Sequence, residues 1–393
     1  MATRFVTFVA TVLFLTGLLV GTLRAEDPPP VQTDAPATTT IGPGMVEVPL
    51  DAPDGLPIVT AQINGRGPFR ILIDTASRRM VVDDDLIRSA ALKPSGTTRL
   101  PDAAGDGAGQ LPAVRIETVA MGTALFSGID AAVVDLDREE GRTRRYDAVA
   151  GLPFFTDCVV TINYAGGNVL LQKGALPEPD GRHVLAYTLE RGRPMITVGV
   201  GDRKFAVGLE TAADAGLTLA PKDRQRVPTG TLLGLAGDPK RFISDVDMVT
   251  PRTKDPITLA GVKLSTVPVS AGSSSSSLGR EVLQLFTIAF DEVHGRVRFQ
   301  SSTNAIDMTP VSRYGYVFSR QDDGLVVVAI FPGSIAERQA LLEGDYIRTV
   351  ERKLASTYTD DDLRQMLRTA RTVLFIVDKQ GLPLMVVANS TDH

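Results

Sequence analysis

The 393-residue chain has one cysteine, three histidines and no tryptophan. Cys158 cannot form a disulfide within the chain, and it belongs to no spacing typical of a metal or redox site. The three histidines are scattered, which argues against a histidine-based zinc site and against a Ser-His-Asp triad. With 41 Lys and Arg against 46 Asp and Glu, the basic excess of a nucleic-acid-binding protein is also missing. We therefore expect no metal, no cofactor and no nucleic-acid partner.

The first 25 residues have a different composition from the rest of the chain. Arg4 precedes an uncharged, mostly apolar run at residues 5–23, and Ala25 follows it. This order is typical of a secretory signal, so we expect cleavage after Ala25 and a periplasmic or secreted protein. The run is also long enough to span a bilayer, so the alternative is an uncleaved segment that anchors the protein to a membrane. An exported protein without disulfides is more typical of a bacterial envelope than of the eukaryotic secretory route.

The remaining sequence divides into a linker and three further segments. Residues 26–44 are rich in Pro, Thr and Ala, which predicts a flexible linker. Residues 45–175 and 183–301 consist of short β-branched runs separated by Gly, Pro and Asp, a pattern typical of β-strands. Residues 304–390 combine strands with one amphipathic helix. We expect a mainly β fold with a small α+β domain at the end.

The two long β segments are similar to each other in sequence, so the chain contains an internal repeat. The last of the matching pairs aligns without a gap at an offset of 128, and its hydrophobic positions coincide. Order and spacing are both conserved, so we infer two similar β lobes that arose by duplication. The matching pairs are residues 55–60 with 192–197, 69–76 with 205–212, and 151–172 with 279–300.

Each lobe contains a hydrophobic strand that ends in an acid, a threonine and an alanine, at Asp74 in the first lobe and Glu210 in the second. Two carboxylates that lie close together cannot both ionise cheaply, so one pKa rises and the pair shares a proton. The ionised acid can then activate a water molecule while the protonated acid donates to a substrate carbonyl. This chemistry hydrolyses peptide bonds without metal, histidine or cysteine, which suits the composition.

The sequence Asp74-Thr75-Ala76-Ser77 resembles the catalytic D-T-G-[AS] turn of the retropepsin-like aspartic proteases. Val149-Ala150-Gly151, with its counterpart Leu278-Gly279, is similar to the segment that this family places beside the turn. The resemblance implies two retropepsin-like closed β lobes in tandem, as in pepsin, with Asp74 and Glu210 as the catalytic pair. Because both acids lie in one chain, a monomer suffices. The supporting residues that the resemblance implies are Thr75, Ala76, Ser77, Thr211, Ala212, Gly151 and Gly279.

The family also implies a clasp between the lobes, made by Thr75 and Thr211, and a glycine-rich hairpin over the cleft, for which residues 105–109 are in the right place. The sequence departs from the family at three positions. Alanine replaces glycine at both third turn positions, and glutamate replaces the second aspartate. An added methyl group can push the two turns apart. The extra methylene of glutamate shifts its carboxylate, and a misplacement of about 1 Å can cost about 100-fold in rate. The alternatives are therefore an active endopeptidase, an inactive pseudo-peptidase that binds peptides, and a site in which Asp214 serves as the second acid.

The C-terminal segment resembles a PDZ domain, because Pro332-Gly333-Ser334 and Gly344-Asp345 occur at the spacing of that family. The resemblance implies a groove that adds a peptide as an extra strand and binds its terminal carboxylate with backbone N–H groups. The partner would be a peptide or protein, bound through a free C-terminus. The expected groove residues are Tyr314, Gly315, Tyr316, Val317, Phe318 and Leu363. The alternative is that these aromatic side chains only fill the core.

Overall fold

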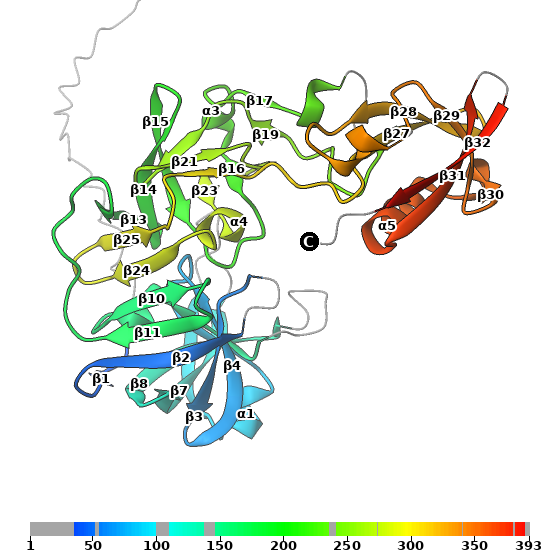
Figure 1. Ribbon diagram of the computed structural model, residues 1–393. Coiled ribbons are helices and arrows are strands. Elements are labelled where there is room, and N and C mark those ends of the chain that lie inside the picture. The colour runs from blue at the N-terminus through cyan, green and yellow to red at the C-terminus, as the bar shows by residue number, and fades with distance from the viewer. Residues whose placement is uncertain are drawn as a thin grey trace, which may run out of the picture. The chain divides into compact units, whose positions relative to one another are not determined.

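The computed structural model describes residues 35–51, 55–99, 110–136, 146–235, 241–272, 274–339, 341–379 and 382–389. The predicted signal segment, residues 1–25, lies outside the described residues. In the part of the chain that is described, no helix is long and apolar enough to cross a membrane. The fold is mainly β, and the two lobes and the C-terminal module belong to one compact unit of the chain. In Figure 1 the first lobe runs from blue through cyan to bluish green, the second from green to yellow and most of the module from orange to red.

The first lobe contains a closed ring of strands. Strand β3 pairs with both β4 and β7, and the ring continues from β4 through β9, β5 and β8 back to β7. Its interior is filled by the buried alternate residues of these strands, such as Ile71 and Ile73. The elements are β1 (Thr38–Thr40), β2 (Met45–Asp51), β3 (Ile58–Ile63), β4 (Arg66–Asp74), β5 (Met80–Asp83), α1 (Leu86–Ser89), β6 (Lys93–Arg99), β7 (Gln110–Met121), β8 (Ala124–Val134), β9 (Ala148–Gly151), the 3₁₀-helix η1 (Leu152–Phe155), β10 (Val159–Asn163) and β11 (Asn168–Gln172).

The second lobe repeats this order of pairing. Strands β14 and β15 correspond to β3 and β4, β23 to β9 and β16 to β5, and the counterpart of the long β8 is divided into β21 and β22. The elements are β12 (Val184–Ala186), β13 (Thr188–Glu190), β14 (Arg193–Val200), β15 (Arg203–Leu209), β16 (Leu217–Leu219), α3 (Pro221–Arg224), β17 (Thr229–Gly230), η2 (Leu232–Gly234), β18 (Phe242–Ile243), β19 (Arg252–Thr253), β20 (Ile257–Leu259), β21 (Val262–Ser265), β22 (Val269–Ala271), β23 (Ser277–Leu278), α4 (Arg280–Leu283), β24 (Thr287–Asp291), β25 (Arg296–Gln300) and β26 (Ala305–Asp307).

A pseudo-twofold axis relates the lobes where β10 pairs with β24. The offset of 128 is confirmed, since β10 and β24 begin and end at equivalent residues, as do β11 and β25. The antiparallel register places Thr161 opposite Ala289, which is its own equivalent in the repeat. A strand pair that is centred on equivalent residues is symmetric, so the axis passes between Thr161 and Ala289. The predicted duplication is therefore visible as a symmetric contact between the lobes.

Two connecting segments pair with neighbouring sheets. One belongs to the predicted linker and the other to the predicted start of the C-terminal domain. Thr38–Thr40 form β1, which pairs with β8, and Ile41 is buried, so the last part of the predicted flexible linker is ordered against the first lobe. Residues 305–307, predicted to open the C-terminal domain, form β26 and pair with β21 of the second lobe. In both places an exposed sheet edge gains hydrogen bonds from the passing chain.

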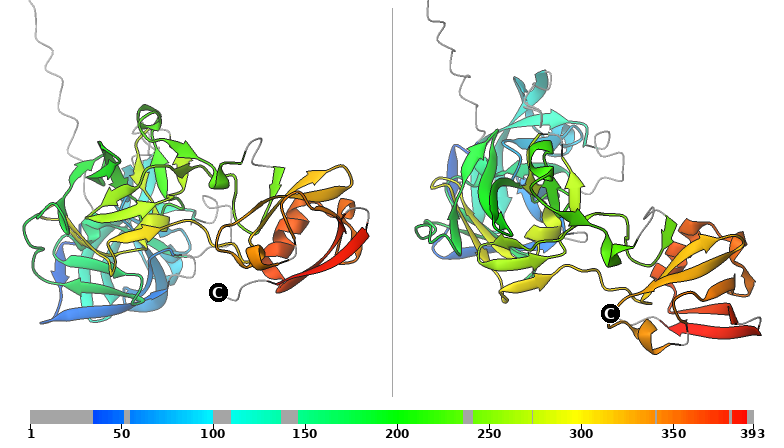
Figure 2. Two further views of the ribbon diagram at one scale, coloured as in Figure 1. Left: turned by 45° about the horizontal axis from the view of Figure 1, so that its top comes forward. Right: turned by 90° about the horizontal axis from the view of Figure 1, so that it is seen from above.

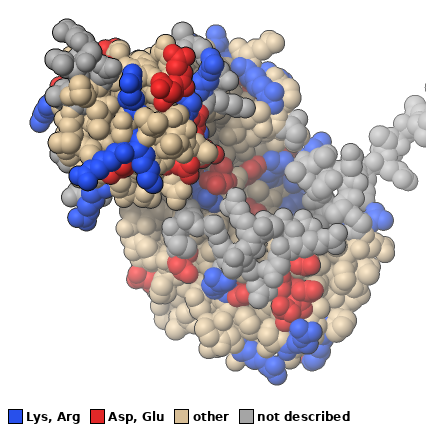
Figure 3. Space-filling model, turned by 90° about the vertical axis from the view of Figure 1, so that its right-hand side faces the viewer, with Lys and Arg blue, Asp and Glu red and all other residues tan. Residues whose placement is uncertain are grey.

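The C-terminal module is a sheet in the order β18-β27-β28-β29-β31-β32. Its helix α5 packs on this sheet, as Figure 2 shows in orange and red. The predicted helix is confirmed: Thr359 caps it with a reciprocal capping box to Asp362, and Leu363 and Leu367 are buried against the sheet. On the face shown in Figure 3, acidic and basic side chains are interspersed. The elements are β27 (Tyr316–Gln321), β28 (Gly324–Ile330), η4 (Ile335–Arg338), β29 (Tyr346–Val350), β30 (Lys353–Leu354), η5 (Ala355–Thr357), α5 (Asp360–Thr369), β31 (Thr372–Lys379) and β32 (Leu382–Asn389).

Candidate active site

The acidic turn of the first lobe follows the end of β4. The Ala76 amide donates to Asp74 Oδ1 at 2.9 Å, and the Ser77 amide donates to the Asp74 carbonyl oxygen at 3.1 Å, so the turn fixes the carboxylate. The parallel strand β9 places Gly151 beside Asp74. A methyl group on Gly151 would lie 2.2 Å from the Ser77 carbonyl oxygen, so only glycine allows this approach.

The turn of the second lobe has the same construction. The Glu210 amide donates to the Leu278 carbonyl oxygen at 3.0 Å, and the Ala213 amide donates to the Glu210 carbonyl oxygen at 3.2 Å. A methyl group on Gly279 would lie 2.4 Å from the Ala215 carbonyl oxygen. Each lobe therefore presents its acid in a turn that is packed directly on a glycine of the neighbouring strand.

Thr75 and Thr211 join the two turns. The Thr75 hydroxyl donates to the Leu209 carbonyl oxygen, and the Thr211 hydroxyl donates to the Ile73 carbonyl oxygen, both at 2.7 Å. Each amide donates to the opposite hydroxyl at 3.1 Å. Both side chains are fully buried, so these reciprocal bonds are shielded from water. Because each threonine directly follows its acid, the clasp holds Asp74 and Glu210 on either side of the pseudo-twofold axis.

The two acids have different electrostatic surroundings. Burial raises the pKa of Asp74 to about 6, and the Glu210 charge adds to this rise, while the Ala76 amide, the Arg193 charge and the Ser77 amide oppose it. Glu210 Oε1 instead accepts from the Arg193 guanidinium at 2.6 Å, in an ion pair whose side chains are only 15% and 18% exposed. Below about pH 6 the pair therefore carries a proton on Asp74.

Arg193, whose guanidinium pairs with Glu210 in the candidate site, was not identified from the sequence. In the repeat it occupies the position of Leu56, so the departure from symmetry was visible in the alignment as a charged residue opposite an apolar one. The neighbouring Gly192 has φ +82°, and a methyl group there would lie 2.0 Å from Cδ of Arg78, which follows the acidic turn of the first lobe. The two lobes thus contact each other beside the acids as well as through the threonines.

Two further predictions concern this region, namely Asp214 as an alternative second acid and the glycine-rich hairpin tip. Asp214 is 67% exposed and forms an ion pair with Arg280 at 2.8 Å, so its carboxylate already has a partner outside the acidic pair. Strands β6 and β7 form the hairpin in which the glycine-rich tip was expected, with Arg99 opposite Gln110. The tip itself, residues 105–109, lies outside the described residues.

One group of acids could offer metal ligands. The carboxylates of Asp83, Asp84 and Asp85, at the end of β5, lie within 4.8 Å of one another. The Asp83 carboxylate, however, accepts from the backbone amides of Asp85 and Leu136 at 3.1 Å each, which explains its burial without a metal.

The residues expected to form a groove in the C-terminal module are buried in its core. Tyr314, Tyr316, Val317, Phe318 and Leu363 are each at most 3% exposed. Gly315 was expected to let the amides of this loop point at a bound carboxylate; its own amide donates to the Ser312 hydroxyl at 2.7 Å. Gly315 has φ +82°, and it is packed so closely on Ser334 that a methyl group would lie 2.1 Å from its hydroxyl oxygen.

One comparison with known proteins matches part of the first lobe. Residues 59–154, which include Asp74 and Gly151, match the family model described as "Aspartyl protease". A search of the curated proteins finds no match. Among solved structures, a crystal structure of Basic 7S globulin from soybean is similar to this chain with a TM-score of 0.42 and 13% identity, over 66% of this chain and 95% of that one.

Proposed function

We propose that the protein is an aspartic-type endopeptidase in which Asp74 and Glu210 hold the water that attacks a peptide bond. The observation that carries this proposal is the buried, reciprocal contact of Thr75 with Thr211, which brings one acid from each lobe to the same axis. The aspartyl protease match over residues 59–154 supports a peptidase-like activity for this lobe.

The unequal surroundings of the acids assign their roles. Glu210, with Arg193 as its counter-charge, is the carboxylate that takes a proton from water. Asp74, which is protonated below about pH 6, donates its proton to the oxygen of the scissile carbonyl as the water oxygen bonds to the carbon. Collapse of the resulting diol breaks the C–N bond. The proton held by Glu210 passes to the leaving amine, and Asp74 regains its proton from the diol.

The test is cleavage of a peptide library, followed by mass spectrometry between pH 4 and pH 8. The wild-type protein should cleave, with a rate that falls as the pH rises through about 6 and Asp74 loses its proton. D74N and E210Q should each lower the rate by at least about 100-fold, whereas the matched control D214N should retain it. A wild-type rate that D74N does not lower would contradict the assignment.

The Glu210–Arg193 ion pair favours a second candidate, an inactive pseudo-peptidase whose cleft binds peptides, because it engages an acid that must reach the water. In that case the wild-type protein would bind library peptides without cleaving them. The triple variant A76G/E210D/A212G combined with R193L, which places leucine where Leu56 stands in the first lobe, would then gain cleavage activity.

The C-terminal module is proposed to be a PDZ-like domain that binds peptide or protein C-termini and delivers them to the lobes. Its capped helix α5 is joined to the end of β27 by the Arg320–Asp360 contact, and a groove between such a strand and helix is the arrangement that adds a peptide strand. We further propose that the protein works as a monomer outside the cytoplasm. Detection of a chain beginning at Glu26 in the envelope or medium would support export with cleavage, and a full-length chain in the membrane fraction would support the anchor.

A further inference from the structure

A short segment of the second lobe lies along the edge strand of the C-terminal module. Strand β18 pairs antiparallel with β27, with Phe242 opposite Ser319 and Ile243 opposite Phe318. The Ser244 hydroxyl continues this contact and donates to the Tyr316 carbonyl oxygen at 3.1 Å. The segment thus occupies the edge to which a bound peptide would be added.

The two side chains of β18 point to opposite faces of the sheet, as in any strand. Ile243 is fully buried in the cluster that contains Phe318 and Leu363, the residues expected to line a peptide groove. Phe242 packs on the other side, in a cluster with Val317. An apolar side chain of the segment therefore fills the space between β27 and α5.

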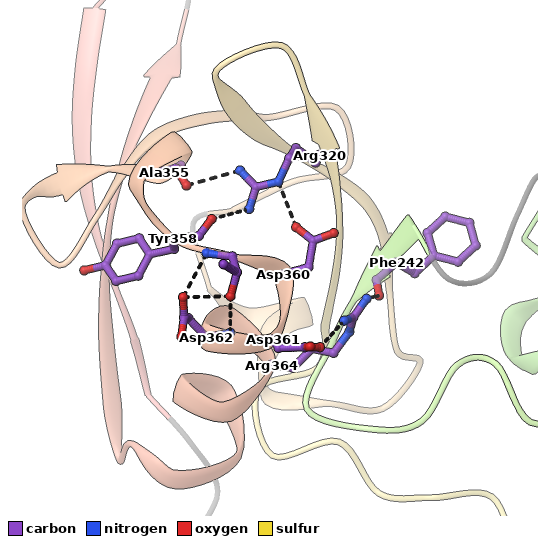
Figure 4. Close-up of polar contacts among 9 residues, drawn as sticks. Phe242, Arg320, Ala355, Tyr358, Asp360, Asp361, Asp362 and Arg364 are labelled. Atoms are coloured by element: carbon purple, nitrogen blue, oxygen red, sulfur yellow. Dashed lines mark hydrogen bonds and ion pairs between the residues drawn. The ribbon is translucent and has the colours of Figure 1, made fainter.

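The ends of the segment are held by polar groups of the module. The Asp245 carboxylate accepts from the Ser312 hydroxyl and from the Arg313 amide, in the loop that leads into β27. At the other end, Arg364 of α5 donates to the Phe242 carbonyl oxygen at 3.1 Å, which Figure 4 shows with β18 beside the helix. A carboxylate bound by a backbone amide, two residues after a buried isoleucine, mimics the end of a peptide.

The helix side of the groove is fixed independently of the segment. Arg320 at the end of β27 bonds Asp360 at 2.7 Å and the Tyr358 carbonyl oxygen at 2.8 Å, and Figure 4 shows these contacts at the start of α5. The strand and the helix are therefore connected without β18, so the groove does not need the segment to set its width.

The segment has a defined place in the repeat. Strands β17 and β19 pair where β6 and β7 pair in the first lobe, after the equivalent strands β5 and β16 and the short helices α1 and α3. Residues 231–251 between β17 and β19 therefore correspond to the tip of the β6–β7 hairpin. The hairpin of the second lobe therefore reaches the module through the pairing of β18 with β27.

We infer that residues 242–245 are an internal ligand of the peptide groove, bound by the isoleucine and the carboxylate, and that a free peptide of the same chemistry displaces them. This inference rests on the proposed PDZ-like groove. The ligand class is an extended peptide with a branched apolar residue followed within two positions by a carboxylate. Binding of such a peptide releases the hairpin tip of the second lobe.

The experiment measures binding of a fluorescein-labelled peptide, Arg-Phe-Ile-Ser-Asp-Val-Asp-Met, which has the sequence of residues 241–248. A tethered ligand has an effective concentration of about 1 mM, so for a groove with Kd of about 10 µM it lowers the apparent affinity about 100-fold. The full-length I243D variant should therefore bind the peptide about 100-fold more tightly than the wild-type protein. V249D, at a position 40% exposed, is the matched control and should bind as the wild type does.

A second variant, D245N, removes only the negative charge of the carboxylate that accepts hydrogen bonds from Ser312 and Arg313. This variant should bind the peptide about 10-fold more tightly than the wild-type protein. A peptide with aspartate in place of the isoleucine should not bind to any variant. Equal affinity of the wild-type protein, I243D and D245N would overturn the internal ligand while leaving the groove in place. If folded I243D and D245N do not bind the peptide, the internal-ligand inference is also overturned. If these variants do not bind free C-terminal peptides either, the proposed groove is wrong as well.

Discussion

The charge of Asp74 should cost the folded protein stability, and replacement by asparagine isolates that cost. Asparagine keeps an oxygen for the Ala76 amide but removes the buried negative charge beside Glu210. The rise of the Asp74 pKa from 3.8 to about 6 corresponds to about 3 kcal/mol, since one pKa unit equals about 1.4 kcal/mol. Because the pKa is raised in the folded state, the stability contributed by protonated Asp74 is complete below about pH 4 and is lost as the pH rises through about 6.

The assay is urea unfolding, followed by far-ultraviolet circular dichroism, of the wild-type and D74N proteins at pH 4 and pH 8. The difference in unfolding free energy between the two proteins should move in favour of D74N by about 3 kcal/mol from pH 4 to pH 8. The matched control is D130N, because Asp130 is an exposed acid in a surface ion pair with Arg115. A difference between wild type and D74N that is the same at both pH values would refute the burial argument.

Three further variants test the construction of the site and of the module. T75V removes a hydroxyl that bonds Leu209 across the lobes, and it should lower the free energy of unfolding by about 2–4 kcal/mol because buried partners are left unsatisfied. G151A places a methyl group against Ser77 and should lower peptidase activity about 100-fold by displacing the acidic turn. T359A removes the cap of α5 and should lower the free energy of unfolding of the C-terminal module by about 1 kcal/mol.

Each of these effects has a comparison variant. T60V changes an exposed threonine of β3, and G42A adds a methyl group where the structure has no atom within 4 Å, so both should resemble the wild type. Unfolding free energies of T75V and T60V that agree within error would contradict the clasp. Equal activity of G151A and G42A would show that the acidic turn tolerates the displacement.

The two lobes could be predicted because their duplication is visible as an internal repeat in a single sequence. The segments at 151–172 and 279–300 align at a constant offset of 128 residues. In the structure, Thr161 and Ala289, which are related by this offset, lie opposite each other. The repeat identifies Thr75 and Thr211 as equivalent positions, whereas their contact across the lobes was implied by the resemblance to the retropepsin-like family.

Other features depended on contacts that no local pattern encodes. The ion pair of Arg193 with Glu210 joins residues 17 apart on neighbouring strands, and only a comparison with Leu56 would have drawn attention to it. The pairing of β18 with β27 joins residues more than 70 apart in the sequence. Strand β18 has only two residues, which is too short to show a hydrophobic periodicity, so this contact could not be predicted from the sequence.

Two departures from the repeat concern the candidate site and the C-terminal module. The threonine clasp and the glycines packed against the acidic turns, Gly151 and Gly279, are the same in both lobes, because the clasp joins the two halves and each glycine allows the close approach of its own turn. The second lobe differs by Glu210 with its partner Arg193, and by a hairpin tip that bonds the C-terminal module through Asp245. On the proposed function, the second lobe therefore has two roles: it supplies Glu210 to the acidic pair, and its segment at residues 242–245 contacts the C-terminal module.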